Sequence, residues 1–236
     1  MTGTTAPRPV VVTAVLAALV TAGALVAAAV LRPGAGPAAG SGPGAEVSAG
    51  PAAGDGCGAA PCQVLDTASV GGMTVELLAD GEGGSGRLRA GGPTNGITAE
   101  TSITAMGARL GPGSLDCVDA AEPVCLVRGP LDGGIVGEVL VWRGDSWRAA
   151  ERPYFSDVGA IVLDTVSGDE VPEIIVVRHE CAGVESAADC GQTPVLAEVF
   201  DLRGERLGCT YQYESPGELR GWPRVELVDS DLRECP

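Results

Sequence analysis

The chain has 236 residues, with 15 Lys and Arg against 31 Asp and Glu, so its formal net charge at pH 7 is −16. This excess of negative charge makes nucleic acids and anionic lipid surfaces poor partners, and we predict no nucleic-acid binding. The Lys and Arg group consists entirely of Arg, a bias that together with abundant Ala, Gly and Val indicates a high-GC bacterial genome.

The N-terminal segment is apolar. Residues 9–31 contain no charged side chain and consist mostly of Val, Ala and Leu. A helix over residues 10–31 would be about 33 Å long, enough to cross a hydrocarbon core of about 30 Å. The apolar core of a cleaved signal peptide has only about 7–15 residues, so we predict a transmembrane signal anchor at 9–31, which binds the membrane, after a cytoplasmic tail at 1–8. Cleavage after the Ala-rich end, which would release a secreted protein, is the alternative.

All cysteines follow the apolar segment. Their even number predicts four disulfides in an oxidising compartment, so we expect the C-terminal domain to be extracytoplasmic. No C-x-x-C pair is present and His179 is the only histidine, which disfavours a zinc site. The eight residues are Cys57, Cys62, Cys117, Cys125, Cys181, Cys190, Cys209 and Cys235.

Residues 32–56 are rich in Pro, Ala, Gly and Ser, and we predict a disordered linker there. The folded domain is expected at residues 57–236. Its apolar segments are short, rich in β-branched residues and bounded by Gly, Pro or Asp, which predicts strands. These segments are "MTVELLAD", "GEVLVW", "EIIVV", "VLAEVFDL" and "RVELVD". The stretch "AETSITAMGARL" at 99–110 suits a short helix or a strand equally.

The strands recur along the chain. "EVLVWRGDSW" at 138–147 and "EVFDLRGERL" at 198–207 share Glu, Val, Arg and Gly at an offset of 60, while "LDCV" at 115 and "LDTV" at 163 match at an offset of 48. We therefore predict a repeat of about 50–60 residues, with an insertion at 179–192 in the second copy. Each cysteine is expected to pair with its neighbour in sequence: 57 with 62, 117 with 125, 181 with 190, and 209 with 235. The "RGD" at 143–145 and its counterpart at 203–205 are expected to be hairpin turns.

The stretch "LDTVSGDEVPEIIVV", residues 163–177, places an acidic loop before a β-branched strand. With the hairpin that follows, it resembles the FG-GAP or VCBS repeat of integrin-α-like β-propellers, over about residues 115–232. The family's loop reads D-x-D/N-x-D-G-x-x-D and often binds calcium. The resemblance implies calcium ligands at Asp164, Asp169 and Glu173. Here Thr165 occupies the position of the first Asp and Glu170 that of the Gly. The alternative is a β-turn that keeps the loop without an ion.

Two further features bear on function. Trp142, Trp147 and Tyr154 lie close together in sequence, and they either pack in the core or form a platform that stacks on a sugar or peptide. Because the chain has one His and its cysteines are expected to be paired, no nucleophile–base pair is evident, and we predict that it is not an enzyme.

We therefore expect an all-β, disulfide-stapled fold of two or three repeated antiparallel meanders, arranged as a propeller-like array or a sandwich, after one N-terminal transmembrane helix. The predicted function is a membrane-anchored, extracytoplasmic, non-catalytic binding or envelope-associated module, whose partner is an extracellular protein or a glycan. Calcium is the only cofactor considered. The alternatives are a membrane-tethered hydrolase that uses acidic residues, and a structural repeat domain that needs a partner to cover its strand edges.

Overall fold

The computed structural model describes residues 56–58, 60–92, 96–182 and 186–236. The predicted tail at 1–8, the anchor at 9–31 and the linker up to residue 55 lie outside the described residues. In the part of the chain that is described, no helix is long and apolar enough to cross a membrane.

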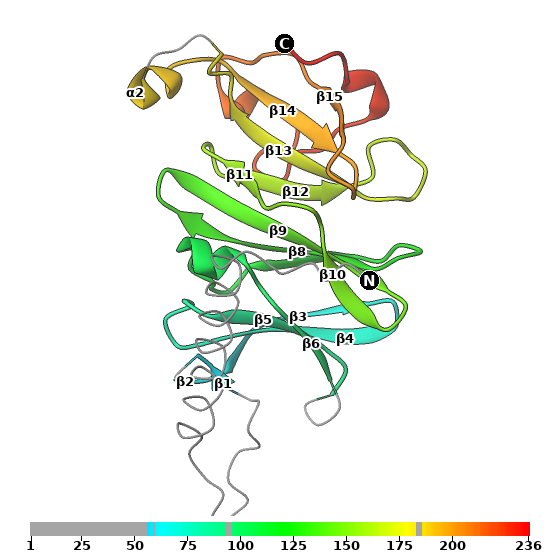
Figure 1. The fold of residues 1–236 in the computed structure, drawn as a ribbon. Helices are drawn as coiled ribbons and strands as arrows, with labels where there is room; N and C mark the ends of the chain where they lie inside the picture. Colours follow the sequence, from blue (N-terminus) through cyan, green and yellow to red (C-terminus); the bar gives the residue numbers. More distant parts are fainter. Residues whose placement is uncertain (1–55, 59, 93–95, 183–185) are drawn as a thin grey trace, which may run out of the picture. The chain divides into compact units, whose positions relative to one another are not determined.

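The described residues form antiparallel β-sheets that follow one another along the chain (Figure 1). A small hairpin of β1 (Gly56–Cys57) and β2 (Ala60–Pro61) comes first. The first sheet is a meander of β3 (Gln63–Val70), β4 (Met73–Ala79), β5 (Gly86–Ala90) and β6 (Ile97–Glu100). The second sheet contains β7 (Leu115–Val118), β8 (Val124–Leu131), β9 (Gly134–Arg143) and β10 (Ser146–Ala149), with β11 (Tyr154–Ser156) also paired to β9.

The third sheet is again a meander, made of β12 (Ala160–Asp164), β13 (Glu173–His179), β14 (Val195–Phe200) and β15 (Arg206–Cys209). Helical structure in the described part is limited to one turn of α-helix, α2 (Ala187–Cys190), and three 3-10 turns, η1 (Ile103–Met106), η2 (Pro216–Glu218) and η3 (Asp229–Asp231). The β-rich fold and the repeated meanders confirm the prediction in its coarse form. The predicted strand "RVELVD" at 224–229 is wrong: this segment forms no strand, and its Val225 and Leu227 pack in a core beside the third sheet. The segment 99–110 contains both expected alternatives, because β6 ends at Glu100 and η1 follows it.

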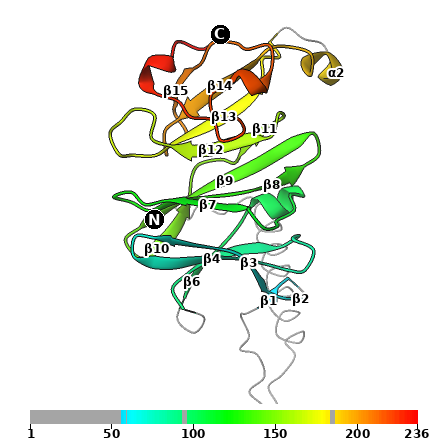
Figure 2. The same cartoon turned by 180° about the vertical axis from the view of Figure 1, so that it is seen from behind.

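The sheets pack face to face, as the views from both sides show (Figures 1 and 2). One apolar core fills the space between the first and second sheets and includes Leu77, Leu88 and Leu140. A second core lies between the second and third sheets and includes Leu126 and Ile174. Each buried Leu or Ile contributes about 1.5–3 kcal/mol relative to an exposed position, so these two interfaces hold the sheets together.

The outer face of the third sheet is covered by residues that follow β15. Leu219, Val225 and Leu227 are buried against Ile175 and Val199, and they form a third core. For this reason every residue of β14 is buried. A strand that is covered on both faces has a continuous apolar sequence rather than an alternating one, which explains the run of Val, Leu, Ala and Phe in this strand.

The predicted disulfide pairing is confirmed at all four sites. Each cysteine bonds its neighbour in sequence: Cys57–Cys62, Cys117–Cys125, Cys181–Cys190 and Cys209–Cys235. The third of these closes the expected insertion, which connects β13 to β14 and carries α2. The hairpin turns at 143–145 and 203–205 are also confirmed, with Gly144 at a φ of 67° and Gly204 at a φ of 82°.

Candidate functional site

A cleft of about 860 Å³ lies between β11, with the loop before it, and the third sheet. Aromatic and charged side chains line it, in contrast to the apolar cores between the sheets. Its lining includes Arg152, Tyr154, Phe155, Asp157, Val176, Arg178, His179, Glu180, Glu198, Phe200, Gly204 and Arg206.

Strand alternation brings these residues to one face of the third sheet. Val176 and Glu198 are Cα partners across β13 and β14, and Phe200 is the partner of Arg206 across β14 and β15. Side chains of directly opposed residues lie on the same side of an antiparallel sheet. Glu198 and Phe200 are two residues apart in β14, so they share that side as well. This face points toward β11 of the second sheet.

At the centre of the cleft a buried carboxylate holds two guanidinium groups. Glu198 is only 4% exposed, and its Oε1 accepts hydrogen bonds from Arg178 Nη2 at 2.7 Å and from Arg206 Nη1 at 3.0 Å. Burial of a carboxylate without partners is costly, and the hydrogen bonds from the two arginines offset this cost. In return, Glu198 fixes the positions of both guanidinium groups.

Tyr154 lies at the Phe200 end of the cleft. Its ring packs on Phe200 with centroids 5.2 Å apart, and Arg152 Cζ lies 5.8 Å from the centroid of the same Phe200 ring. Tyr154 is 5% exposed, and its hydroxyl has no hydrogen-bond partner among the described residues. Burial raises the pKa of Tyr154, and Arg152 opposes part of this rise. This hydroxyl oxygen exposes less than 1 Å², and a buried hydroxyl without a partner costs about 1–3 kcal/mol.

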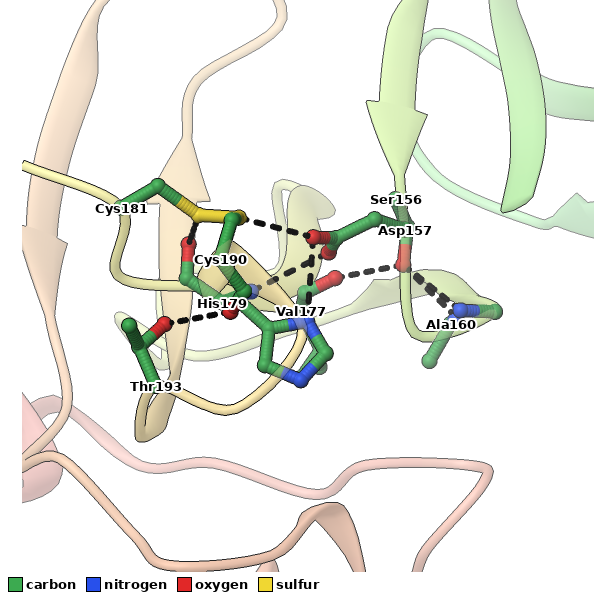
Figure 3. A network of polar contacts seen from close by, with 9 residues as sticks. Ser156, Asp157, Ala160, Val177, His179, Cys181, Cys190 and Thr193 are labelled. Carbon is green, nitrogen blue, oxygen red and sulfur yellow. Dashed lines mark hydrogen bonds and ion pairs between the residues drawn. A yellow bond between two sulfur atoms is a disulfide. The ribbon is translucent and has the colours of Figure 1, made fainter. Parts of the chain in front are cut away.

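A second polar network occupies the His179 end (Figure 3). Asp157 accepts a hydrogen bond from the backbone N–H of His179 at 3.1 Å, and its Oδ2 lies 3.0 Å from His179 Nδ1. The Ser156 hydroxyl donates to the carbonyl of Val177 and accepts from the N–H of Ala160 at 3.0 Å. These residue types occur in a Ser–His–Asp triad, but the connectivity differs, because the hydroxyl donates to the backbone rather than to an imidazole.

The three aromatic residues singled out in the sequence are divided between two places. Trp142 and Trp147 are partners across the β9–β10 hairpin, with ring centroids 5.3 Å apart in an edge-to-face arrangement. Trp147 is buried in the core between the first and second sheets, and Trp142 packs against that core. Tyr154 belongs instead to the core on the opposite face of the second sheet. Of the three, only Tyr154 lines the cleft.

The acidic loop between β12 and β13 is organised by its own hydrogen bonds. Glu173 is buried and accepts from the N–H of Val166 at 2.8 Å, the N–H of Ser167 at 3.3 Å and the hydroxyl of Ser167. Asp169 accepts from the N–H of Val171 at 3.0 Å and from the Ser167 hydroxyl at 2.9 Å. These bonds, the Val171 bond first, lower the pKa of Asp169. Ser167 thus joins two of the three predicted calcium ligands.

Asp164, the third predicted ligand, accepts a hydrogen bond from the N–H of Thr165 at 2.9 Å. Glu170, which occupies the position of the family's Gly, has a φ of 64°. It is the only described residue other than Gly with a positive φ. The loop therefore keeps the left-handed backbone that a Gly would permit, with a side chain that disfavours it.

Among the described residues, two groups place atoms that could bind a metal within 4.8 Å of one another. Asp164, Asp169 and Glu173 of the acidic loop do not form such a group. In both groups the two cysteines are joined to each other in a disulfide, so neither can offer a thiolate. The groups are Asp157 with Cys181 and Cys190, and Glu198 with Cys209 and Cys235.

One sequence feature relates to the charged centre of the cleft, namely a glutamate that recurs in apolar strands. This feature alone does not predict the cleft. Glu198 interrupts an apolar strand, and its counterpart in the earlier copy is Glu138, which is also 4% exposed. Glu138 accepts a hydrogen bond from the N–H of Ser102 at 2.7 Å instead of binding an arginine. At the offset of 60, Ser146 stands where the third sheet has Arg206. The third sheet alone therefore assembles two arginines on this repeated glutamate.

Comparisons with protein-family models, with curated proteins and with solved structures find no match for this chain.

Proposed function

We propose that this protein is a membrane-anchored, extracytoplasmic, non-catalytic binding module, and that its ligand binds in the cleft between β11 and the third sheet. The carrying observation is the convergence of polar groups in the cleft, where the buried Glu198 holds Arg178 and Arg206 and leaves their other N–H donors available to a ligand. A concave site with a few convergent polar groups is typical of a ligand-binding site.

Two observations support the location outside the cytoplasm. All eight cysteines are in disulfides, which persist in oxidising compartments. Residues 9–31 have the length and composition of an anchor. Carbonate extraction of membranes from cells that express the full chain tests the anchor. We expect the protein to remain with the membranes, and its release into the soluble fraction would contradict anchoring.

The propeller-like interpretation is supported by three successive four-stranded antiparallel meanders and by the left-handed backbone at Glu170, where the resembled family has Gly. We further infer that the acidic loop keeps its shape without an ion, because Glu173 and Asp169 already accept hydrogen bonds from the loop itself. Calcium titration of the full chain, followed by calorimetry, tests this inference. We expect no saturable heat; a millimolar or tighter isotherm that disappears in Asp169→Ala would contradict it.

Binding is tested with an array that carries both glycans and peptides, probed with the full chain in mild detergent. We expect retention on a subset of spots, and reduced retention for Arg206→Gln, which removes one cleft guanidinium and leaves Arg178 on Glu198. Arg220→Gln is the matched control, because Arg220 is exposed and pairs with Asp231 outside the cleft-lining residues. Equal retention of both variants on every spot would refute the assignment of the cleft.

A further inference from the structure

The disulfide Cys181–Cys190 is the only one of the four in which neither cysteine is buried. Both of its cysteines are partly exposed. In each of the other three disulfides one cysteine is buried, namely Cys57, Cys125 or Cys209. A thiolate must reach a sulfur atom to break a disulfide, so access decides which bond takes part in thiol–disulfide exchange. Access therefore favours exchange at Cys181–Cys190 over the other three disulfides.

The segment that this disulfide closes connects β13 to β14 and contributes little to the apolar cores. None of the residues from 181 to 194 whose exposure the structure describes is buried. Two of its hydrogen bonds are local, because the Ala182 N–H donates to the Glu180 carboxylate at 3.0 Å and the Thr193 hydroxyl donates to the Cys190 carbonyl at 2.8 Å. Figures 1 and 2 accordingly show α2 at the margin of the third sheet, outside the stack of sheets. The disulfide is therefore a main constraint on this segment.

The same disulfide borders the candidate cleft. Glu180, Cys181 and Ala182 form part of the lining of the cleft. Figure 3 shows the disulfide beside Asp157, another lining residue, whose Oδ2 lies 4.0 Å from Cys190 Sγ. A chemical change at the disulfide therefore acts directly on one wall of the cleft.

The effect of opening the disulfide on this wall can be estimated. The N–H of Glu180 donates to the carbonyl of Pro194 at 2.8 Å, and this bond closes the neck of the segment. The disulfide joins residues 9 apart in sequence within that neck. In the chain-entropy model, removal of a link of this length shifts the equilibrium between the closed and the open neck toward the open form by about 100-fold.

We propose that Cys181–Cys190 is a thiol–disulfide exchange site whose co-substrate is a dithiol outside the cytoplasm, and that its reduction weakens ligand binding in the cleft. One thiolate of the dithiol attacks a sulfur of the disulfide, the S–S bond breaks, and the other cysteine leaves as a thiolate and takes up a proton. The second thiol of the dithiol then loses its proton, attacks the mixed disulfide and releases the first cysteine, which is also protonated. The two cysteines thus gain two electrons and two protons, and the dithiol is oxidised to a disulfide. The effect on ligand binding rests on the proposed function, whereas the exchange chemistry does not.

The first test is selective reduction of the full chain in mild detergent. The chain is treated with increasing concentrations of dithiothreitol, free thiols are blocked with iodoacetamide, and the alkylated peptides are identified by mass spectrometry. We expect Cys181 and Cys190 to be alkylated first, while the other three disulfides are still closed. Cys117–Cys125 is the internal control, because it joins residues 8 apart in sequence instead of 9 but has a buried cysteine. Reduction of Cys117–Cys125 at the same or a lower dithiothreitol concentration would overturn the proposal.

Hydrogen exchange of the selectively reduced chain then measures the wall of the cleft. The Glu180 N–H should exchange up to about 100-fold faster after reduction. The Arg128 N–H, which donates to the Ser114 carbonyl at 2.9 Å in the second sheet, should exchange at an unchanged rate. The double variant Cys181→Ser with Cys190→Ser should behave like the reduced chain, and it should remain folded because both cysteines are partly exposed. Equal exchange of the Glu180 N–H in the oxidised and reduced chains would overturn the proposal.

The array experiment connects the disulfide to ligand binding and separates the two proposals. We expect the reduced chain and the double variant to be retained less than the oxidised chain on the same spots. If retention depends on Arg206 but does not change on reduction, the proposed function holds and control of binding by the disulfide is wrong. If retention does not depend on Arg206, the cleft is not the binding site, and the alkylation and hydrogen-exchange results still decide whether the disulfide is an exchange site.

Discussion

Replacement of Glu170 by Gly is expected to stabilise the protein, because Glu170 has a φ of 64°. A residue with a β carbon pays about 1–2 kcal/mol for the left-handed conformation. Gly removes this cost but gains about 0.5–1 kcal/mol of conformational freedom in the unfolded chain. The difference is a net stabilisation of about 0.5–1 kcal/mol. For a domain of this size, we expect a rise in melting temperature of about 1–4 °C.

The assay is thermal unfolding of the full chain in detergent, followed by circular dichroism, with two controls. Glu170→Ala removes the charge but keeps the β carbon, so its melting temperature should stay close to that of the natural chain. Gly168→Ala should lower it, because Gly168 has a φ of 76° and an added β carbon meets no atom within 4 Å, which leaves the backbone as the only cause. If Glu170→Ala stabilises as much as Glu170→Gly, the effect comes from charge, and the backbone explanation is refuted.

Three other predictions follow from the same structure. Thr165→Asp combined with Glu170→Gly restores two positions of the resembled calcium loop, and the melting temperature of this variant should rise with calcium while that of the natural chain does not. Burial raises the pKa of Tyr154 in the folded protein. The contribution of Tyr154 to the free energy of unfolding is therefore complete below its unfolded-state pKa and decreases as the pH rises toward its folded-state pKa. Urea unfolding between about pH 9 and 12 should show a steeper loss of stability for the natural chain than for Tyr154→Phe. Replacing Cys209 and Cys235 together by Ser opens a disulfide between residues 26 apart in sequence. In the chain-entropy model this should lower the free energy of unfolding by about 3.5 kcal/mol. A smaller loss of stability than that caused by opening the β1–β2 hairpin disulfide would contradict this reasoning.

Local patterns predicted much of the fold. The β-branched segment "EIIVV" became β13, and the Arg-Gly pairs at 143–144 and 203–204 became hairpin turns, because such features depend on neighbouring residues alone. The disulfides could be predicted for a related reason, since each joins cysteines that are neighbours in sequence. By contrast, β5 was not predicted, because "GRLRA" alternates small and apolar residues with arginines and has no β-branched side chain.

The cleft could not be predicted in the same way. Arg178, Glu198 and Arg206 are separated by up to 28 residues, and they meet only through the register of three strands. Tyr154 is buried by Phe200 of another sheet, a contact that no local pattern indicates. The separation of Trp142 from Tyr154 has the same origin, because the two lie on opposite faces of the second sheet.

The residues that cover the outer face of the third sheet are synthesised after its strands, so the sheets complete their folding in a fixed order. The core shared by the first and second sheets is made of residues up to Trp147, so it can close while the rest of the chain is still being made. The third sheet cannot close in this way, because Leu219 and Leu227 cover the outer face of strands that were completed before them. Until Cys235 is added, Cys209 also remains a thiol that can react with the wrong partner. The late stage of synthesis, with one apolar face open, is therefore when the nascent chain most needs protection from aggregation.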